Sequence, residues 1–209
     1  MVEIHPFVLG MVQTNTYLLG DDESKEAVVI DPADDGQAIV HAALNHQWVI
    51  KAIWLTHAHF DHIGGVEEIR QSTQSPISVG LHPEDLPLWR NQGGAALFGL
   101  RFDTGAEPDF GFYHGQRLNL GDYQFEVRHT PGHTPGHVVF YCPELAVCFC
   151  GDLIFQGSVG RTDLPGGDFH QLINSIHQNI LTLPDKTRLL AGHGPETSVL
   201  IERLENPFL

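Results

Sequence analysis

The sequence predicts an α+β protein in which two β-sheets are flanked by helices. Short β-type runs come in groups in both halves of the chain, and segments with helical spacing of apolar residues lie between and after these groups. The 209 residues suffice for one domain, residues 1–209, whose core would bury roughly 70% of the surface of the unfolded chain. The last predicted helix follows almost directly on His193 and leaves no length for a second domain.

The first half of the chain is expected to contain four strands and two helices. Asp34 or Asp35 is the predicted N-cap of a helix that runs to about Gln47, because apolar residues recur at helical spacing in this segment. A shorter amphipathic helix is expected from Ile63 to a point before Pro76. The predicted strands are residues 2–9, 15–20, 26–31 and 51–56.

The second half begins with an irregular segment and continues with strands and helices. Residues 91–117 are rich in Gly and Phe and follow neither period, so we expect them to form a wall over a pocket. Cys148 and Cys150 alternate within an apolar run and are interpreted as small core side chains; three cysteines without a CxxC motif predict no disulfide framework. The predicted strands are 122–129, 137–142, 145–151 and 187–192, and the predicted helices are about 168–182 and 195–205.

Composition argues against several classes of function. A net charge of −15 with 11 dispersed Lys and Arg residues is unlike a nucleic-acid-binding protein. No apolar run approaches the ~20 residues that a membrane helix requires, so no membrane partner is expected. The N-terminal MVEIHP lacks the pattern of an export signal, and a cytoplasmic location is therefore expected. The sequence leaves the oligomeric state open.

Four apolar strands each lead into a potential metal ligand. These ligands are His57, His133, Asp152 and His193. Strand ends are rigid platforms from which loops project, so side chains that are distant in the sequence can converge at one rim. The sequence therefore predicts a metal site at one edge of the protein.

The segment THAHFDHIGG, residues 56–65, carries four of the candidate ligands. In extended backbone, His57 and His59 point to the same side and can bind one ion together. Asp61 and His62 lie where the chain turns into the following helix, and they point elsewhere. This spacing suits a second ion beside the first.

The chemistry of the ligands predicts two divalent transition-metal ions. Imidazole and carboxylate together favour zinc, with iron or manganese as alternatives, over calcium or magnesium. Seven ligands are too many for one tetrahedral zinc ion. A water between two ions ~3.5–4 Å apart would have a pKa near ~7 and would be the nucleophile, with Asp61 and Asp152 as catalytic residues. In this interpretation Asp152 bridges the ions, one of which has His57, His59 and His133 and the other Asp61, His62 and His193.

The ligand series, taken in order along the chain, resembles that of the metallo-β-lactamase superfamily. The segments TPGHTPGHVVF, GDLIFQGSVGRTDLPGGD, AGHGP and ERLENPFL are similar to those of the short, single-domain glyoxalase II-like proteins. The resemblance implies a four-layer αββα sandwich with the metals at one edge. It also implies hydrolysis of the thioester S-lactoylglutathione, or of a related acyl thioester. Full-length glyoxalase II differs in a C-terminal helical region that supplies basic residues to the glycine carboxylate of glutathione.

A second branch of the superfamily, the persulfide dioxygenases, has a similar histidine series and a GRTD-like segment. That resemblance implies a single iron held by the residues that match His57, His133 and Asp152, and glutathione persulfide as substrate. The DLPGGD segment after Arg161 is more similar to the hydrolase branch. We therefore predict a hydrolase and keep the dioxygenase as the alternative. A non-catalytic metal-binding protein would need a broken ligand set, and all seven positions are filled.

Further residues are candidates for contacts around the metals. Arg161 and Asp163 are expected to brace the Gly-rich loop after Asp152 rather than to bind substrate. His137 is expected to orient a neighbouring ligand. No GxSxG motif is present and no cysteine has a convincing His–Asn or His–Asp pair, so no side-chain nucleophile is predicted. The candidates for lining the pocket are His82, Trp89, Phe98 and Tyr113.

Overall fold

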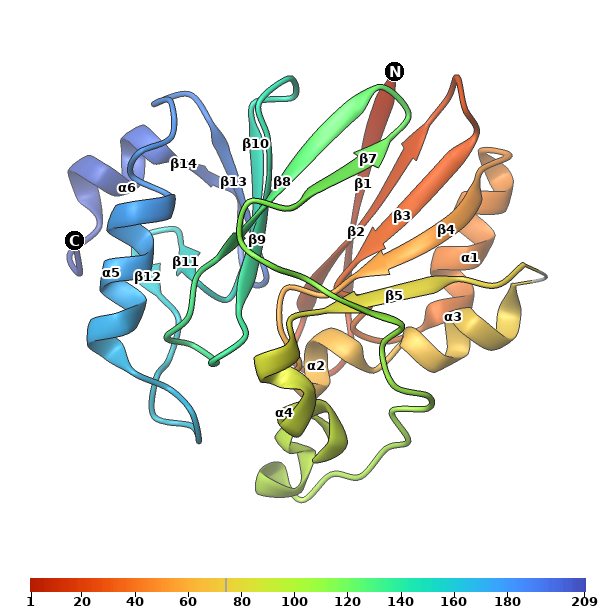
Figure 1. Ribbon diagram of the computed structural model, residues 1–209, viewed down its shortest axis with the longest axis horizontal. Helices are drawn as coiled ribbons and strands as arrows, with labels where there is room; N and C mark the ends of the chain where they lie inside the picture. Colours follow the sequence, from red (N-terminus) through yellow and green to blue (C-terminus); the bar gives the residue numbers. More distant parts are fainter. Residues whose placement is uncertain (74) are drawn as a thin grey trace.

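Two six-stranded sheets pack face to face in the computed structural model, which describes residues 1–73 and 75–209. Helices cover the outer face of each sheet, so the predicted four-layer αββα sandwich is confirmed (Figure 1). The first sheet has, in spatial order, β1 (Val2–Leu9), β2 (Thr14–Asp21), β3 (Glu26–Ile30), β4 (Val49–Trp54), β5 (Ser78–Leu81) and β6 (Phe110–Gly111). The second has β14 (Thr197–Ser198), β13 (Arg188–Ala191), β10 (Val147–Gly151), β9 (Val138–Cys142), β8 (Tyr123–His129) and β7 (Arg117–Leu120).

The helices fall into two outer layers and a group at one edge. The first sheet is covered by α1 (Gly36–Asn45) and α3 (Val66–Ser72), and the second by α5 (Phe169–Asn179) and α6 (Val199–Glu205). At the edge lie α2 (Phe60–Ile63), the 3₁₀ turns η1 (Pro83–Asp85) and η2 (Gln92–Phe98), and α4 (Leu86–Arg90), beside the short hairpin of β11 (Ile154–Phe155) and β12 (Ser158–Val159). No helix among the described residues has both the length and the apolar character needed to cross a membrane.

Apolar side chains fill all three interfaces between the layers. Between the sheets, the Trp54 ring of β4 lies 5.3 Å from that of Phe125 and 5.6 Å from that of Phe140. Residues of β8 alternate in burial, with Phe125 and Val127 turned into this interface, as expected for a half-buried strand. The buried Cys148 and Cys150 pack toward α5, which agrees with their interpretation as core side chains.

Strand directions explain why the ligand loops meet. β3, β4 and β5 are parallel, so the loops that follow them leave the first sheet at the same edge. In the second sheet β8 and β10 are both antiparallel to β9, and β13 is parallel to β10; their following loops therefore also emerge together. Backbone hydrogen bonds join the two edges, from Val138 N to Thr56 O (2.8 Å) and from Asn15 N to Gly192 O (2.6 Å).

Several predicted boundaries were wrong. The helix expected from Ile63 is α3, which begins at Val66. Ile63 ends the separate helix α2, and Gly64 and Gly65 lie between the two helices; a Cβ at Gly64 would collide with the carbonyl oxygen of Ala33. The final helix begins at Val199 rather than near 195, because residues 197–198 add strand β14 to β13. Strands β5, β6 and β7 were not predicted, nor were η1 and α4, and residues 92–98 of the segment expected to be irregular form the 3₁₀ turn η2.

Candidate metal centre

All seven predicted ligands lie together on loops at the joined edge of the two sheets. His57 and His59 follow β4, and Asp61 and His62 are on the adjoining helix α2. The remaining three each come from a loop of the second sheet: His133 after β8, Asp152 directly after β10 and His193 after β13.

Three histidines form a first cluster. His59 Nδ1 lies 2.9 Å from His133 Nε2, and His57 Nε2 lies 3.3 Å from the same atom. One nitrogen from each ring is within 4.8 Å of the other two, and all three residues are buried. Three imidazole nitrogens at this spacing are a donor set that suits zinc or iron.

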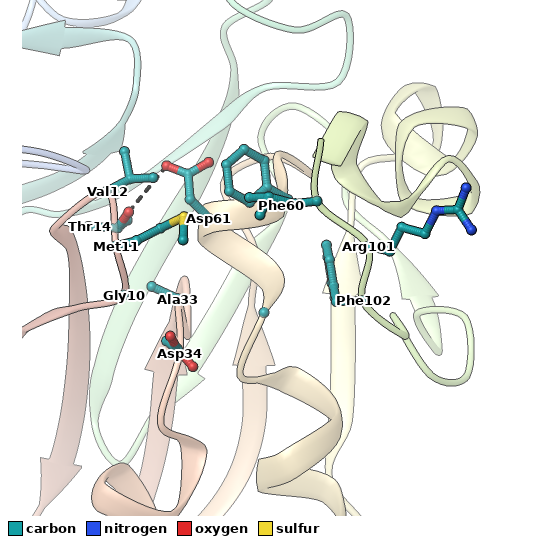
Figure 2. A pocket seen from close by; sticks show the side chains of 12 residues that line it. Gly10, Met11, Val12, Thr14, Ala33, Asp34, Phe60, Asp61, Arg101 and Phe102 are labelled. Atoms are coloured by element: carbon teal, nitrogen blue, oxygen red, sulfur yellow. Dashed lines mark hydrogen bonds between the residues drawn. The ribbon is translucent and has the colours of Figure 1, made fainter. Parts of the chain in front are cut away.

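A second cluster combines a carboxylate with two histidines. Asp61 Oδ2 lies 3.3 Å from His193 Nε2 and 3.8 Å from His62 Nε2. Thr14 Oγ1 donates a hydrogen bond of 3.2 Å to the same carboxylate oxygen, which fixes its orientation (Figure 2). This cluster is partly exposed, because the His193 side chain retains 26% of its accessible surface.

The Asp152 carboxylate lies between the two clusters. Its Oδ1 is 3.3 Å from His62 Nε2, and its Oδ2 is 3.6 Å from both His133 Nε2 and His193 Nε2. Among the described residues, His62 Nε2 and Asp152 Oδ1 are buried without a hydrogen-bond partner. Buried polar atoms without partners are costly and rare, and cations between the clusters would satisfy both atoms. The residues present therefore fit two metal ions.

The charge states of the two clusters differ. Burial, with the neighbouring His62 and His133, lowers the pKa of His57, and burial also lowers the pKa of His59 to about 3. Both rings are thus neutral, as metal ligands must be. Burial opposes ionisation of Asp152, but the adjacent His62 and His133 bring its pKa far below the usual range.

In the second cluster, carboxylates raise the pKa of both histidines. Burial acts against charge on His62, yet Asp152 and Asp61 raise its pKa well above the usual value. The pKa of His193 is likewise raised, because the Asp61 hydrogen bond and the Asp152 charge outweigh burial. In the second cluster, protonated histidines thus balance the negative charge of the two carboxylates, and a bound metal ion would take over this role.

Comparison with known proteins places the chain in a family. The family model of the metallo-beta-lactamase superfamily matches residues 9–193. The chain belongs to the metallo-β-lactamase superfamily. Two curated relatives match over nearly their full lengths. The probable metallo-hydrolase YqgX of Bacillus subtilis (strain 168) is 39% identical over 96% of this chain and 94% of its own. The hydroxyacylglutathione hydrolase GloC of Haemophilus influenzae is 39% identical over 100% and 97%.

Solved structures of this superfamily include close neighbours. The B3 metallo-beta-lactamase BLEG-1 has a TM-score of 0.90 and 41% identity, over 99% of each chain. TTHA1623, solved in a di-iron-bound form, has a TM-score of 0.88 and 43% identity, over 98% of this chain and 100% of that one. ETHE1 from Myxococcus xanthus has a TM-score of 0.81 and 26% identity, over 98% and 83%. The protein is therefore a member of a superfamily of metallo-hydrolases.

Hydrogen bonds behind the superfamily's ligand series hold the rings in place. Asp31, which follows β3, accepts from His62 Nδ1 (2.9 Å) and from the backbone and hydroxyl of Thr56 (2.7 and 2.6 Å). His133 Nδ1 donates to the carbonyl oxygen of Arg161 (2.8 Å). In both His62 and His133, the hydrogen bond at Nδ1 leaves Nε2 directed at the candidate metal centre. Hydrogen bonds of this kind commonly orient the histidine ligands of metal ions.

His137 lies behind Asp152 rather than among the ligands. Its Nε2 accepts the backbone N–H of Asp152 (3.2 Å), and its Nδ1 donates to Thr130 Oγ1 (2.9 Å). Both ring nitrogens are therefore engaged. This position accords with the expectation that His137 orients a neighbouring ligand.

Sequence reasoning missed Asp85, at the end of η1. Asp85 is fully buried and accepts three hydrogen bonds, from Ala58 N (2.9 Å), Thr134 Oγ1 (2.8 Å) and Gly136 N (2.7 Å). Ala58 lies between His57 and His59, and Thr134 follows His133, so one carboxylate ties together the two loops of the first cluster. No motif or period in the sequence marks Asp85, which lies between the predicted helix that ends before Pro76 and the predicted irregular segment 91–117.

The expectation that His82 lines the pocket was wrong. Its ring stacks on that of His129 with centroids 4.0 Å apart, and its Nδ1 accepts the backbone N–H of Glu84 at the start of η1. Trp89 is buried in the core, and Tyr113 is exposed and does not line the cavity beside the clusters. Of the predicted aromatic residues, Phe98 lines that cavity.

The Arg161 side chain also lines the cavity but is paired. Its Nε and one terminal nitrogen lie 2.8 and 2.7 Å from the two oxygens of Asp163, while its carbonyl holds His133. These contacts accord with the expected bracing of the loop. The cavity has a volume of about 620 Å³, and Asp61, His133, Asp152 and His193 form its floor.

Proposed function

We propose that the protein is a metal-dependent hydrolase of acyl thioesters, with S-lactoylglutathione or a related acyl thioester as substrate. The observation that carries the proposal is a pair of donor clusters that share Asp152 and open into a cavity large enough for a small acyl group. The 39% identity to the hydroxyacylglutathione hydrolase GloC over the whole chain supports a thioester substrate.

Each cluster has an assigned ligand set in this proposal. His57, His59 and His133 would hold one ion, and Asp61, His62 and His193 the other, with Asp152 shared. Two divalent ions would supply a Lewis acid for the substrate carbonyl oxygen and an activated water as the nucleophile. The donor set suits zinc, iron or manganese.

The two carboxylates, Asp61 and Asp152, are the proposed catalytic side chains. Asp152 faces both clusters and Asp61, held by Thr14, lies on the cavity wall. In the reaction, a C–O bond to water forms, the C–S bond breaks, and the thiolate leaves with the electron pair while water releases its protons. A thiolate leaves without prior protonation, so the reaction requires no strong general acid.

A mononuclear iron persulfide dioxygenase is the second candidate. The compact set of His57, His133 and Asp152 favours it, because the resemblance to the persulfide dioxygenases implies a single iron held by these three residues. The 39% identity to the hydroxyacylglutathione hydrolase GloC favours the hydrolase. The second cluster does not separate the two candidates, because a similar histidine series occurs in both branches.

Metal content and two assays test the proposal. We expect close to two ions of zinc, iron or manganese per chain by elemental analysis, together with loss of thioester absorbance in a panel that includes S-lactoylglutathione. A content of one iron, with oxygen uptake on addition of glutathione persulfide and no thioester turnover, would replace the hydrolase with the dioxygenase. Absence of both activities in the metal-loaded protein would contradict each candidate.

A further inference from the structure

Two adjoining pockets make up the cleft beside the metal centre. The larger is the cavity of about 620 Å³ that holds the ligand side chains. The smaller, of about 310 Å³, lies on the other side of Asp61 and Phe60 (Figure 2). The two pockets share five wall residues: Met11, Val12, Phe60, Asp61 and Leu100. A substrate whose carbonyl group lies at the metals can therefore extend one of its substituents into either pocket.

The walls of this cleft are mainly apolar. Beyond the ligands, the larger pocket is lined chiefly by Phe60, Phe98, Leu100, Phe155, Val159 and Leu164. Met11 and Phe98 stand at its mouth with 75% and 49% of their surface exposed. Large apolar side chains exposed together around a cavity typically mark a surface that binds an apolar group.

Few of the described side chains that line the cleft are positively charged, and neither of its two arginines points an unpaired guanidinium into it. Among the described residues that line the two pockets, Arg161 and Arg101 are the arginines and no lysine is present; the lining histidines, His59, His133 and His193, are candidate metal ligands. Asp163 engages the Arg161 guanidinium through both of its oxygens. The Arg101 side chain extends away from the smaller pocket, whereas the carboxylates of Asp34 and Asp61 lie on it (Figure 2). The two carboxylates of a glutathione moiety would therefore meet apolar side chains and acidic groups.

We propose that the preferred substrates are uncharged thioesters with an apolar acyl chain, and that glutathione contributes little to recognition. This inference rests on the proposed thioester hydrolysis and narrows its substrate class. Each methylene that the walls bury strengthens binding about fourfold, so a medium-length acyl chain gains more from this cleft than the short, hydroxylated lactoyl group. Away from the metal ions, an anionic thiol moiety finds no lysine among the described lining residues and one arginine already paired with Asp163, and it faces a chain of net charge −15.

Four thioesters separate the acyl and thiol contributions. Hexanoyl and lactoyl groups are each joined to glutathione and to N-acetylcysteamine, which carries no charge, and kcat/KM is measured for the metal-loaded enzyme. We expect hexanoyl to exceed lactoyl about 10-fold or more on both thiols, and glutathione to improve kcat/KM less than about 3-fold. A kcat/KM more than about 3-fold higher for both glutathione thioesters than for the matching N-acetylcysteamine thioesters would overturn the inference and leave the proposed hydrolase intact. No turnover of all four would contradict the proposed function itself.

Variants of the walls identify the residues responsible. Leu164→Ser should reduce the ratio of hexanoyl to lactoyl kcat/KM by about 3- to 10-fold. Leu204→Ser, at a position on α6 that is 72% exposed, is the matched control and should leave this ratio unchanged. Arg161→Gln should change KM for S-lactoylglutathione less than about 3-fold. A KM increase above 10-fold in that variant would show that Arg161 anchors glutathione and would overturn the inference.

Equilibrium binding supplies a readout that does not depend on turnover. Thioethers lack the carbonyl and cannot be hydrolysed, so S-hexyl-N-acetylcysteamine and S-methylglutathione can be titrated calorimetrically into metal-depleted protein. We expect measurable binding of the hexyl compound, weakened by Leu164→Ser and not by Leu204→Ser. Tighter binding of S-methylglutathione would contradict the apolar assignment whatever the activity of the loaded enzyme.

Discussion

The two ligand clusters are built on different principles. The first consists of buried histidines whose pKa values are lowered, and hydrogen bonds from surrounding loops hold them in place. The second is partly exposed, and attraction between carboxylates and histidines with raised pKa values holds it together. The first is thus pre-formed by packing, whereas the second depends on charges that a cation would replace. We expect the two positions to respond differently to substitution.

Replacing Asp152 should have the largest effect on metal binding and activity, because it removes a ligand from both metal positions and not from one of them. This carboxylate faces both clusters, with one oxygen near His62 and the other near His133 and His193. Asp152→Ala is expected to deplete both metal positions and to reduce kcat/KM at least ~10³-fold. Elemental analysis of the purified variant is the measurement. Full metal occupancy would show that Asp152 does not bridge.

Variants that lack a single ligand should each lose the metal ion of one position and retain that of the other. His193→Ala is expected to leave close to one ion per chain, since it removes the most exposed ligand of the second cluster alone. His59→Ala is expected to empty the first position and abolish thioester turnover. Elemental analysis and the thioester assay on both variants test this. Wild-type kcat in His59→Ala would count against a mechanism that uses both ions.

The ligands were predictable from sequence because their signal is local. Apolar strands that end at His57, His133, Asp152 and His193 fix four loop positions, and strand direction then places the loops at one edge. The split between the two clusters followed from the i, i+2 spacing in residues 56–65.

The groups that hold the ligands were not predictable, because their bonds span long sequence separations. Asp85 bonds to residues 27 and 49 positions away, and no period or motif marks such a pairing. His82, three residues earlier, was predicted to line the pocket, yet its ring stacks on that of His129. Strand β5 is four residues long and gave too short an apolar run to predict.

Asp85→Asn should weaken the first position selectively. The amide replaces one acceptor oxygen with an NH₂ group that faces the donors Ala58 N, Thr134 Oγ1 and Gly136 N. We expect metal affinity at the first position to fall about 10- to 100-fold, with the second position changed less. Competition with a chelator measures both affinities, and Asp122→Asn, at an exposed position, is the control. Equal weakening of both positions would indicate a general loss of stability.

Asp85 is also expected to contribute a pH dependence of stability. Burial raises its pKa to about 6, although the three hydrogen bonds act in the opposite direction. An unfolded Asp titrates near ~3.9, so the folded state binds the proton more tightly between these values. The resulting stabilisation is complete below pH ~4 and is lost as the pH rises through about 6. The free energy of unfolding of metal-depleted wild-type protein, minus that of Asp85→Asn, should fall by about 2–3 kcal/mol between pH 4 and 7. Urea unfolding of both proteins across this range provides the measurement. A difference that does not vary with pH would mean that Asp85 is ionised throughout, and that its hydrogen bonds to the first-cluster loops outweigh the cost of burying its charge.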